Sequence, residues 1–332
     1  MLAHAQRLAG PERDDGAGVA EVVRAVAGLQ AQDAGAAALG VRARLAGASL
    51  EAVARARFEE RSVVRIWCMR GTLHLVPAED ARWLVALLGP VGLAKARRRR
   101  EQMGVDGPEA VAAVRAALED GPLTRHSIAA HARAGGLRFA EHPQAAVHLV
   151  VGAVLGGDVI EAGPGPAYAL TDDWLAPSDP LPDRSAALAE LARRHANAHP
   201  PASPEDFAYW SGLPLRDART GFAAIAAELD QVRVLGRAAW VPRGLEPAPP
   251  HVRLLPAFDG ILLGHRDRAL TVGPEHARDV YPGGGILRPT VLVDGQVAGL
   301  WRIERGAPVV SAFAVAPDLD DEIADVVRFR GG

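Results

Sequence analysis

Residues 63–76, VVRIWCMRGTLHLV, contain two runs rich in β-branched and aromatic side chains, separated by Arg70-Gly71. Two such runs around a short turn predict a β-hairpin. Three segments before the hairpin have the apolar spacing of helices: residues 19–30, 36–45 and 49–58. Three helices followed by a hairpin is the element order of a winged helix, so this stretch decides the predicted fold.

The same element order recurs twice downstream. The second set of predicted helices covers residues 109–118, 124–133 and 143–155, before strands at 159–161 and 168–170. The third set covers residues 188–197, a helix starting at Ser203-Pro204, and 215–229, before strands at 232–235 and 238–241. The three third helices begin near residues 49, 143 and 215, and this unequal spacing indicates similar modules rather than a strict repeat. We predict three tandem winged helices, over residues 1–105, 106–180 and 181–246.

The last part of the chain has a different composition. Pro247, Pro249 and Pro250 mark a linker. Beyond it, five short strands are predicted, at residues 252–255, 261–263, 269–272, 290–293 and 297–301. We predict a small antiparallel sheet or barrel over residues 247–332, with an acidic helix at 318–325, and an α+β fold class for the whole chain.

Length and composition limit the possible protein classes. A chain of 332 residues, 49% of them hydrophobic, indicates two to four compact units. No apolar run is long enough to cross a bilayer and no leader pattern begins the chain, so we expect a soluble, cytoplasmic protein. The single cysteine, Cys68, excludes an internal disulfide and a cysteine-based zinc site, and its apolar surroundings predict a packed thiol.

The charge is unevenly distributed along the chain. The net charge is −3, yet residues 41–100 carry thirteen basic and five acidic side chains, or +8, which leaves −11 for the remainder. This asymmetry favours a localised site for a polyanion. Two features of the region stand out, Arg70 at the hairpin turn and the run from Lys95 to Arg100 at a helix end. Both could contact phosphates. The alternative is that Arg70 is an ordinary turn arginine and that the basic run is a solvated helix terminus.

The segment Gly28-Leu29-Gln30-Ala31-Gln32-Asp33 closes the first helix pattern. Two amides two residues apart point about 200° from each other on a helix but to the same side on an extended chain. The turn residues that follow predict that the pair lies where the helix has unwound. Neutral amides there can hold a water molecule or a base edge. The alternative, two solvated residues at a helix end, stays open.

Other catalytic constellations have little support. His195 and His199 have the spacing of a helical metal pair, but the usual Glu and third ligand are missing. The paired aspartates at 14–15, 172–173 and 320–321 occur in loop-like or terminal contexts. No glycine-rich loop has a nucleotide-binding context. We therefore expect neither a metal nor a cofactor.

Four ordered blocks carry a family resemblance across nearly the whole chain: GLQAQD at 28–33, RGTLHLV at 70–76, PEDFAYWSG at 204–212, and LLPAFD at 254–259 with LGHRDR at 263–268. They resemble the winged-helix DNA glycosylases of the AlkZ and YcaQ type. The family's catalytic motif is Gln-Φ-Gln in the AlkZ-like branch and Gln-Φ-Asp in the YcaQ-like branch, and Gln30-Ala31-Gln32 matches the former. Ala34 stands where a proline is frequent, and this departure and the small Ala31 leave the lesion preference open.

The resemblance implies a C-shaped array of three winged helices closed by a β-barrel. It also implies a monofunctional DNA glycosylase that hydrolyses the N-glycosidic bond of N7-alkylated purines in double-stranded DNA, and that unhooks interstrand cross-links in repair or self-resistance. We expect a monomer associated with the nucleoid. A hairpin enters the minor groove in this family, and the sequence does not say which one does so here.

The resemblance assigns expected roles to particular residues. Gln30 and Gln32 are the expected catalytic residues. The expected DNA contacts are Arg65, Arg70, Lys95, Arg97, Arg98, Arg99, Arg100, Arg266 and Arg268, and the expected cleft supports are His74, Asp259 and Asp267. The alternative function is a winged-helix DNA-binding protein or regulator without catalysis. Such a protein gains nothing from the glutamine pair, and residues 147–155 are too apolar for a base-reading helix. A scaffold with an empty cleft is a third possibility.

Overall fold

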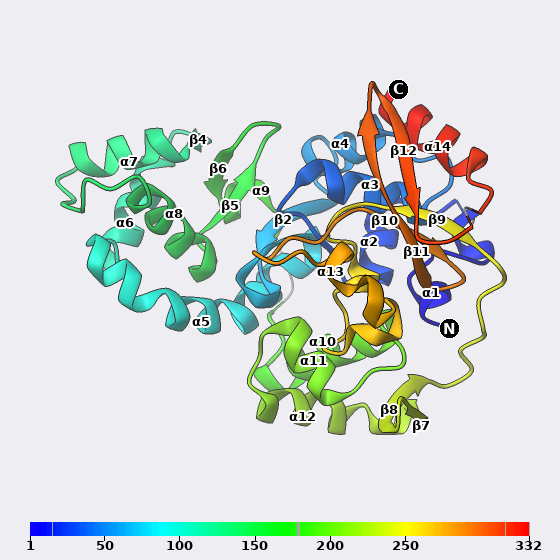
Figure 1. Cartoon of the computed structure of the whole chain (residues 1–332). Helices are drawn as coiled ribbons and strands as arrows, with labels where there is room; N and C mark the ends of the chain where they lie inside the picture. Colours follow the sequence, from blue (N-terminus) through cyan, green and yellow to red (C-terminus); the bar gives the residue numbers. More distant parts are fainter. Residues whose placement is uncertain (15, 178–179, 316, 332) are drawn as a thin grey trace. The chain divides into compact units, whose positions relative to one another are not determined.

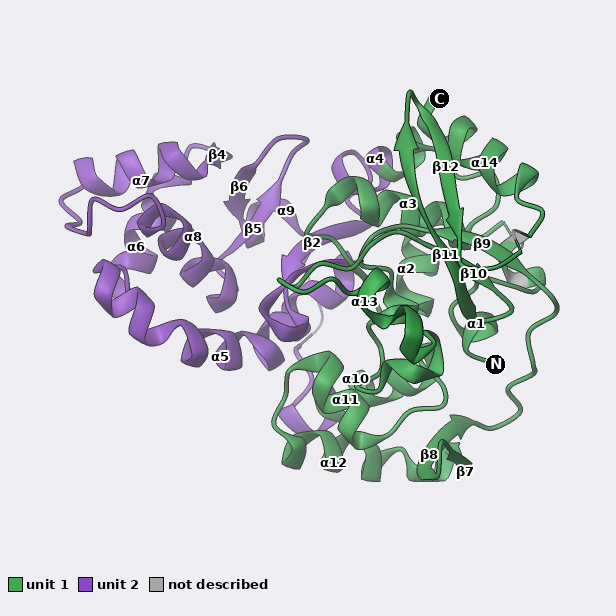
Figure 2. Ribbon diagram, viewed as in Figure 1, with its two compact units in different colours: residues 1–53, 188–332 green, residues 54–187 purple. Residues whose placement is uncertain are grey.

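The computed structural model describes residues 1–14, 16–177, 180–315 and 317–331. The chain divides into two compact units, residues 1–53 with 188–332, and residues 54–187 (Figure 2). Both units combine helices with antiparallel strands, so the predicted mixture of helix and sheet is confirmed.

The unit of residues 54–187 begins within α4 (Leu50–Phe58), whose N-terminus is capped by the Ser49 hydroxyl, 3.1 Å from the Ala52 amide. The predicted hairpin follows as β2 (Val63–Trp67) and β3 (Leu73–Pro77), with Ile66 opposite His74. Arg70 occupies the turn with a φ of 56°. The long helix α5 (Ala78–Met103) comes next and ends at Gly104 in a left-handed conformation.

The second predicted module lies wholly in this unit. Its elements are α6 (Pro108–Ala117), β4 (Leu123–Thr124), α7 (Arg125–Ala134), α8 (Ala145–Gly156), β5 (Val159–Ala162), β6 (Ala167–Leu170) and α9 (Thr171–Trp174). The strands form an antiparallel sheet in the order β4-β6-β5. Helix α8 is the centre of the core, because Leu149, Val150 and Ala153 are buried among side chains of the other two helices. Helix α5 approaches α8 so closely that a Cβ at Gly89 would lie 2.1 Å from the Leu155 carbonyl oxygen.

The other unit contains the two ends of the chain. Its first elements are α1 (Leu2–Ala5), η1 (Pro11–Asp14), α2 (Val19–Ala25), β1 (Leu29–Gln30) and α3 (Ala34–Arg44). The elements of the third predicted module are α10 (Arg184–Ala198), α11 (Pro204–Ser211), α12 (Leu215–Ala224), η3 (Ala226–Glu228), β7 (Leu229–Val234) and β8 (Arg237–Pro242). The Ser203 hydroxyl accepts a hydrogen bond from the Asp206 amide at 3.1 Å, which starts α11 at the predicted residue. The predicted helix over 19–30 is too long, because α2 already ends at Ala25.

The C-terminal sheet is antiparallel, in the order β12-β11-β10-β9 (Figure 1). Its strands are β9 (Val252–Leu255), β10 (Thr290–Val293), β11 (Gln296–Glu304) and β12 (Ala307–Ala312), of which β12 was not predicted, and α14 (Asp320–Gly331) packs beside it. The edge strands β9 and β12 are not paired with each other in the described part of the chain. The expected barrel is therefore corrected to an open sheet.

Two predicted strands in this region are wrong. Residues 261–262 and 269–270 instead lie in short 3-10 turns, η4 (Gly260–Leu262) and η5 (Arg268–Leu270), and the predicted strand residues that follow each turn are not in a strand either. Asp259 and Asp267 cap these turns by accepting hydrogen bonds from Ile261 and Ala269, each at 3.1 Å. The turns η6 (Pro274–His276) and α13 (Ala277–Val280) follow. An aspartate that accepts from the amide two residues ahead favours a turn over an extended strand.

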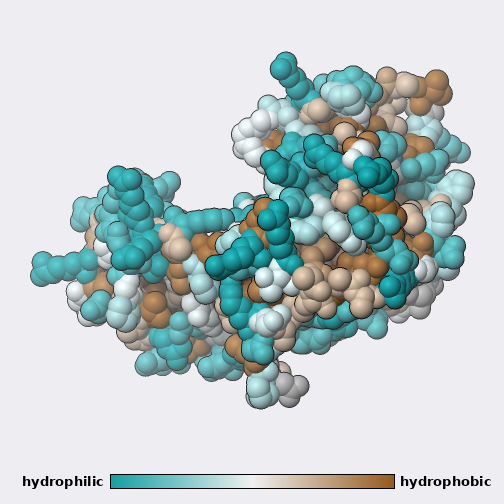
Figure 3. All heavy atoms as spheres, turned by 90° about the horizontal axis from the view of Figure 1, so that it is seen from below, coloured by the Kyte–Doolittle hydropathy of each residue, from teal (hydrophilic) through white to brown (hydrophobic). Residues whose placement is uncertain are grey.

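The cores of both units are apolar and their surfaces mixed. Leu254, Val291, Trp301 and Val326 form a buried cluster in which the C-terminal sheet packs against Leu39 of α3. Figure 3 shows hydrophilic residues over much of one face, with smaller hydrophobic groups between them. No helix in the described ranges is long and apolar enough to cross a membrane. Cys68 is buried and burial raises the pKa of its thiol to about 12, which confirms the packed thiol.

Candidate functional site

The glutamine pair lies on an extended segment between α2 and α3. Burial alternates along it: Leu29 is 2% exposed and Ala31 is 1% exposed, whereas Gln30 is half-buried and Gln32 is exposed. This alternation has the period of an extended chain, which puts successive side chains on opposite sides. The two apolar residues anchor the segment, and both amides belong to its outer side. The predicted unwinding of the helix before the pair is confirmed.

The backbone fixes this segment at both ends. Ala27 and Gly28 adopt φ values of 60° and 91°, and the Gly28 amide donates to the Val23 carbonyl at 2.8 Å, which terminates α2. At the other end, the Asp33 carboxylate accepts a hydrogen bond from the Ala36 amide at 3.0 Å and caps α3. These two caps fix where the backbone of residues 29–32 begins and ends.

The amide pair itself carries no charge. Amides do not titrate in the physiological range, and the carboxylate that follows them, Asp33, is engaged as a helix cap. Two amides can orient a water molecule through their carbonyl oxygens and can donate through their NH₂ groups. They are poor general bases. A reaction at these amides therefore needs a leaving group that departs without acid or base assistance from the protein.

Helix α3, which follows the segment, is fastened by two buried arginines. Arg42 is fully buried and donates to Glu322 and Asp325 of α14, each at 3.1 Å, and to the Leu254 carbonyl at 2.6 Å. Arg44 is equally buried and donates to Asp259 at 2.7 and 2.8 Å and to the Gln6 side chain at 2.8 Å. These pairs tie α3 to the C-terminal sheet and to α14.

The role expected for Asp259 is corrected by this arrangement. Its carboxylate has no exposed surface and is committed to Arg44 and to the cap of η4, so it supports α3 from within rather than lining a cleft. From the sequence, Arg42 and Arg44 are predicted only as part of the basic region of residues 41–100. Their acidic partners lie more than 200 residues away in sequence, so local sequence carried no signal for the pairs.

Two of the expected DNA contacts, Arg65 and Arg100, instead bind carboxylates of the protein. Arg65 donates to the Glu161 carboxylate at 2.7 Å within its unit, and Arg100 is 5% exposed and forms an ion pair with Asp106 at 3.1 Å. A guanidinium held in this way is not available to a phosphate. Both residues are removed from the set of DNA contacts.

The remaining expected contacts are on the surface. Lys95, Arg97 and Arg98 are exposed on α5, and Arg97 forms an exposed pair with Glu101 at 2.8 Å. Arg99 and Arg70 are partly exposed, and Arg99 donates to Gln144 at 2.8 Å. A pair of this exposed kind contributes little stability, so these side chains are free to exchange it for a phosphate.

The chain as a whole matches a known family. A family model described as DNA glycosylase AlkZ-like matches residues 23–329. The chain belongs to the AlkZ-like DNA glycosylase family. A curated relative from Streptomyces sahachiroi, an interstrand DNA cross-link repair glycosylase, is 28% identical over 340 residues, which cover 94% of this chain and 90% of the relative. The solved structure of Streptomyces sahachiroi DNA glycosylase AlkZ has a TM-score of 0.81 and 24% identity, covers 99% of this chain and 95% of its own, and shows a shared fold.

Arg266, Arg268 and Asp267 lie together on one exposed loop of this AlkZ-like chain. The Arg266 amide donates to Asp206 at 2.9 Å, and the Arg268 guanidinium lies 3.7 Å from the centre of the Tyr281 ring. Asp267 caps η5 and is exposed. The side chains of this loop remain candidates for contact with DNA.

His74, the other expected cleft support, is buried in β3 of the AlkZ-like chain. Its Nδ1 atom lies 3.1 Å from the Thr72 carbonyl oxygen, to which it donates. Burial lowers the pKa of His74 to about 3, helped by the positive charge of Arg70. A neutral, enclosed imidazole contributes packing, and the expected role at a cleft is corrected to a structural one.

The histidines with metal-ligand spacing are also interior groups. His195 and His199 are buried with ring centroids 5.1 Å apart, and His195 Nε2 lies 3.0 Å from the Gly264 carbonyl oxygen. Trp210 packs against both rings. No group of three potential metal ligands occurs among the residues that the structure describes.

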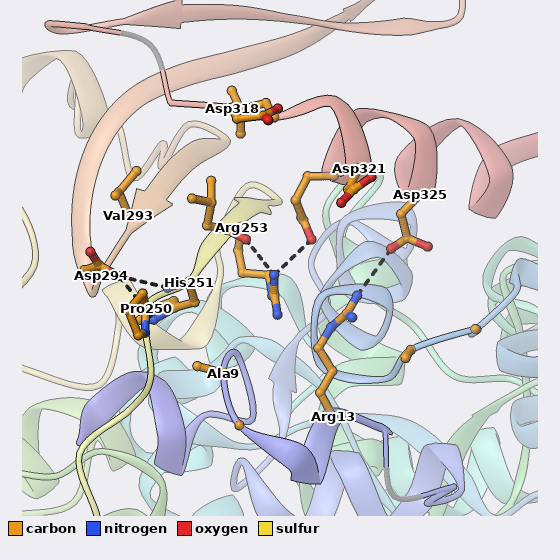
Figure 4. Close-up of a pocket in the computed structure, with 16 residues that line it drawn as sticks. Ala9, Arg13, Pro250, His251, Arg253, Val293, Asp294, Asp318, Asp321 and Asp325 are labelled. Atoms are coloured by element: carbon orange, nitrogen blue, oxygen red, sulfur yellow. Dashed lines mark hydrogen bonds and ion pairs between the residues drawn. The ribbon is translucent and has the colours of Figure 1, made fainter.

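An acidic pocket of about 710 Å³ lies elsewhere in the unit that carries the glutamine pair (Figure 4). Five acidic residues line it, including Asp318, Asp321 and Asp325, together with Arg13 and Arg253. Arg13 pairs with Asp325 at 3.4 Å, and Arg253 pairs with Glu322 at 3.3 Å. The excess of carboxylates repels phosphates, so this pocket does not suit DNA, and none of the predicted site residues lines it.

Proposed function

We propose that this AlkZ-like chain is a monofunctional DNA glycosylase that hydrolyses the N-glycosidic bond of N7-alkylated purines in double-stranded DNA. Gln30 and Gln32 are its catalytic residues. The observation that carries the proposal is the alternation along residues 29–32, which anchors Leu29 and Ala31 and leaves both amides on the outer side of a fixed segment. A regulator without catalysis gains nothing from such a pair of amides.

The chemistry suits amides because the substrate is already activated. A guanine alkylated at N7 is cationic, so the electron pair of the C1′–N9 bond stays with the base and neutralises it as it leaves. The amide oxygens of Gln30 and Gln32 orient a water molecule toward C1′ and favour the positive charge that develops on the sugar. The water oxygen forms the new bond to C1′ and releases a proton to solvent. Unmodified guanine is not excised, because nothing here protonates it.

Cross-links extend this substrate class. The curated relative is described as an interstrand DNA cross-link repair glycosylase, which supports the same activity here. Substituents at N7 project into the major groove, and a cross-linked base cannot swing fully out of the helix. Amides on the outer side of a segment can act on the sugar without a deep pocket that encloses the base. The protein unhooks such lesions as a monomer on nucleoid DNA.

The proposed architecture keeps three winged-helix modules at residues 1–105, 106–180 and 181–246, followed by a sheet domain at 247–332. The order of helix, strand, helix, helix and hairpin over residues 108–170 supports the second module. Exposed or partly exposed basic side chains supply the phosphate contacts: Arg70, Lys95, Arg97, Arg98, Arg99, Arg266 and Arg268.

The test is release of free base from a duplex that carries N7-methylguanine. We expect the wild-type protein to release the base and leave alkali-labile abasic sites. We expect Gln30→Ala/Gln32→Ala to lower the single-turnover rate roughly 10²–10³-fold, the size of effect seen when a positioned polar group is removed. Gln231→Ala, at an exposed glutamine of β7, is the matched control. Intact excision by the double variant contradicts the assignment.

A further inference from the structure

Leu29, which directly precedes the glutamine pair, lies against a glycine of α3. Gly40 is buried in the interior of this helix, and a Cβ placed on it would lie 3.5 and 3.6 Å from the two δ-methyl carbons of Leu29. Glycine is a poor residue for a helix interior, and here it lets the Leu29 side chain approach the helix backbone closely. Leu29 is 2% exposed, so solvent does not reach this contact.

The part of α3 under Leu29 is held by the buried ion pair of Arg44. The Gly40 carbonyl accepts a hydrogen bond from Arg44 Nη1 at 3.0 Å, and the same nitrogen donates to Asp259 at 2.8 Å. A chain of contacts therefore runs from Asp259 through Arg44 to Gly40. Gly40 in turn contacts Leu29, which belongs to the sequence block GLQAQD, whereas Asp259 belongs to the block LLPAFD. Two of the four sequence blocks are joined in this way.

We propose that Gly40 is a positioning residue for the glycosylase reaction: it seats Leu29 and thereby sets where the two amides hold the attacking water molecule. The inference rests on the proposed function, because that function gives the chemistry to Gln30 and Gln32. Gln30 follows Leu29 directly in the chain, so a displacement of Leu29 also moves Gln30. A misplacement of about 1 Å at a reacting group can cost roughly 10²-fold in rate.

The size of the side chain at position 40 decides how far Leu29 is displaced. Carbon atoms 3.5 and 3.6 Å apart are in ordinary van der Waals contact, so the Cβ of an alanine fits against Leu29 without overlap. The γ-carbons of a valine extend one bond further and overlap the Leu29 methyl groups. A β-branched side chain in a helix has one strongly preferred rotamer, so it has little freedom to turn away. The competing account is that Gly40 serves helix packing alone.

The experiment measures Kd and the single-turnover rate at saturating protein on the N7-methylguanine duplex. We expect Gly40→Val to lower the rate roughly 10²-fold and to change Kd less than about twofold, because phosphate contacts carry most of the affinity. Gly40→Ala should lower the rate less than about fivefold, because its Cβ fits.

A compensating variant tests whether Gly40 acts through Leu29. Leu29→Ala removes as many carbon atoms as Gly40→Val adds, so Gly40→Val/Leu29→Ala conserves the volume of the contact. Each single variant should lower the rate, and the double variant should recover at least about tenfold of the loss in Gly40→Val. A purely structural role for Gly40 does not predict this recovery at an unchanged Kd.

Ala223→Val, at an exposed position of α12, is the matched control for a β-branched residue in a helix, and it should change the rate less than about twofold. Leu29→Ile covers the case in which Gly40→Val does not fold. It keeps the volume and moves the branch point from Cγ to Cβ, which withdraws a methyl group from Gly40, so the rate should fall roughly tenfold. An unchanged rate in Leu29→Ile or in folded Gly40→Val overturns the inference. So does a loss in Gly40→Val that Leu29→Ala does not relieve.

A spectroscopic measurement separates this inference from the proposed function. The side-chain NH₂ groups of Gln30 and Gln32 are observed by nitrogen-15 NMR after selective labelling of glutamine, and Gln30→Ala and Gln32→Ala assign their signals. We expect both signals to shift in Gly40→Val, to return toward their wild-type positions in Gly40→Val/Leu29→Ala, and to stay in place in Ala223→Val. If these shifts occur and no lesion is excised, the positioning role stands and the proposed function fails. If lesions are excised and neither the signals nor the rate respond to Gly40→Val, the positioning role fails alone.

Discussion

Helix α3 buries both of its arginines, whereas the last turns of α5 expose Lys95, Arg97 and Arg98. The Arg42 guanidinium pairs with Glu322 and Asp325 and that of Arg44 pairs with Asp259, and the segment that leads into α3 presents two neutral amides. The comparison teaches that positive charge in this sequence has two uses. In α3 it forms buried ion pairs with residues distant in sequence, and on α5 it stays at the surface, where we propose that it binds a polyanion.

Removing a buried charge from α3 should have the largest effect. We expect Arg44→Met to lower the free energy of unfolding by about 3–5 kcal/mol, because Asp259 is then left buried without its partner. Chemical denaturation measures the loss. Arg44→Met/Asp259→Leu should recover part of it, because no unpaired charge remains in the interior.

Arg266→Met is the control for this experiment, because Arg266 is exposed. It should change the unfolding free energy by less than about 0.5 kcal/mol. A loss below about 1 kcal/mol for Arg44→Met would show that the buried pair does not fasten α3.

Removing the exposed charges of α5 should act on binding instead. We expect Lys95→Gln/Arg97→Gln/Arg98→Gln to raise Kd roughly tenfold to a hundredfold for damaged and undamaged duplexes alike, because phosphate contacts carry no sequence or lesion information. The slope of log K against log salt should fall by about 2.7, three contacts' worth. Fluorescence anisotropy at several salt concentrations measures both quantities.

The control for this variant is Arg216→Gln/Arg219→Gln/Arg243→Gln, which removes three exposed arginines of the other unit. It loses the same formal charge. An equal loss of affinity in both variants would mean that net charge alone matters and that the end of α5 is not a phosphate contact.

A change of pH should have the smallest effect on activity. Between pH 6 and 8 the single-turnover rate should stay constant, because neither glutamine titrates. Stability should behave differently, because burial lowers the pKa of His74 to about 3. The unfolded state takes up this proton near pH 6.5 and the folded state does not, so stability present above pH 6.5 is lost as the pH falls toward 3.

The size of this loss can be measured. Between pH 7 and pH 5, His74 should remove about 2 kcal/mol of unfolding free energy. Denaturation of the wild-type protein and of His74→Gln at both pH values isolates this contribution. An excision rate that changes with the ionisation of one group in the same range would mean that a titrating residue takes part in the chemistry.

Local sequence patterns predicted most helices and hairpins well. The start of α11 at Ser203-Pro204 and the β2–β3 hairpin follow from cap and turn residues that act over a few positions. The same kind of pattern failed at Ile261 and Ala269, where aspartate side chains bond to nearby amides and form turns in place of strands. The C-terminal sheet stays open because its edge strands β9 and β12 do not pair with each other in the described part of the chain. A local sequence pattern does not report which distant strands pair.

Local sequence likewise predicted some features of the candidate site and missed others. The unwound segment of Gln30 and Gln32 was predictable, because the spacing of the amides and the turn residues after them are local features. The ion-pair partners of Arg65 and Arg100 were not predictable. A basic side chain looks the same in sequence whether it meets a phosphate or a carboxylate, and Glu161, the partner of Arg65, is 96 residues away.

We propose that uncharged residues perform the chemistry and that charged residues perform the binding. To test this, Kd and the single-turnover rate on N7-methylguanine duplex are measured for two variants side by side. We predict that Gln30→Ala/Gln32→Ala keeps its Kd and loses the rate, and that Lys95→Gln/Arg97→Gln/Arg98→Gln raises Kd and keeps the rate at saturating protein. The opposite pattern, with the glutamine variant cleaving normally once bound, would contradict the account.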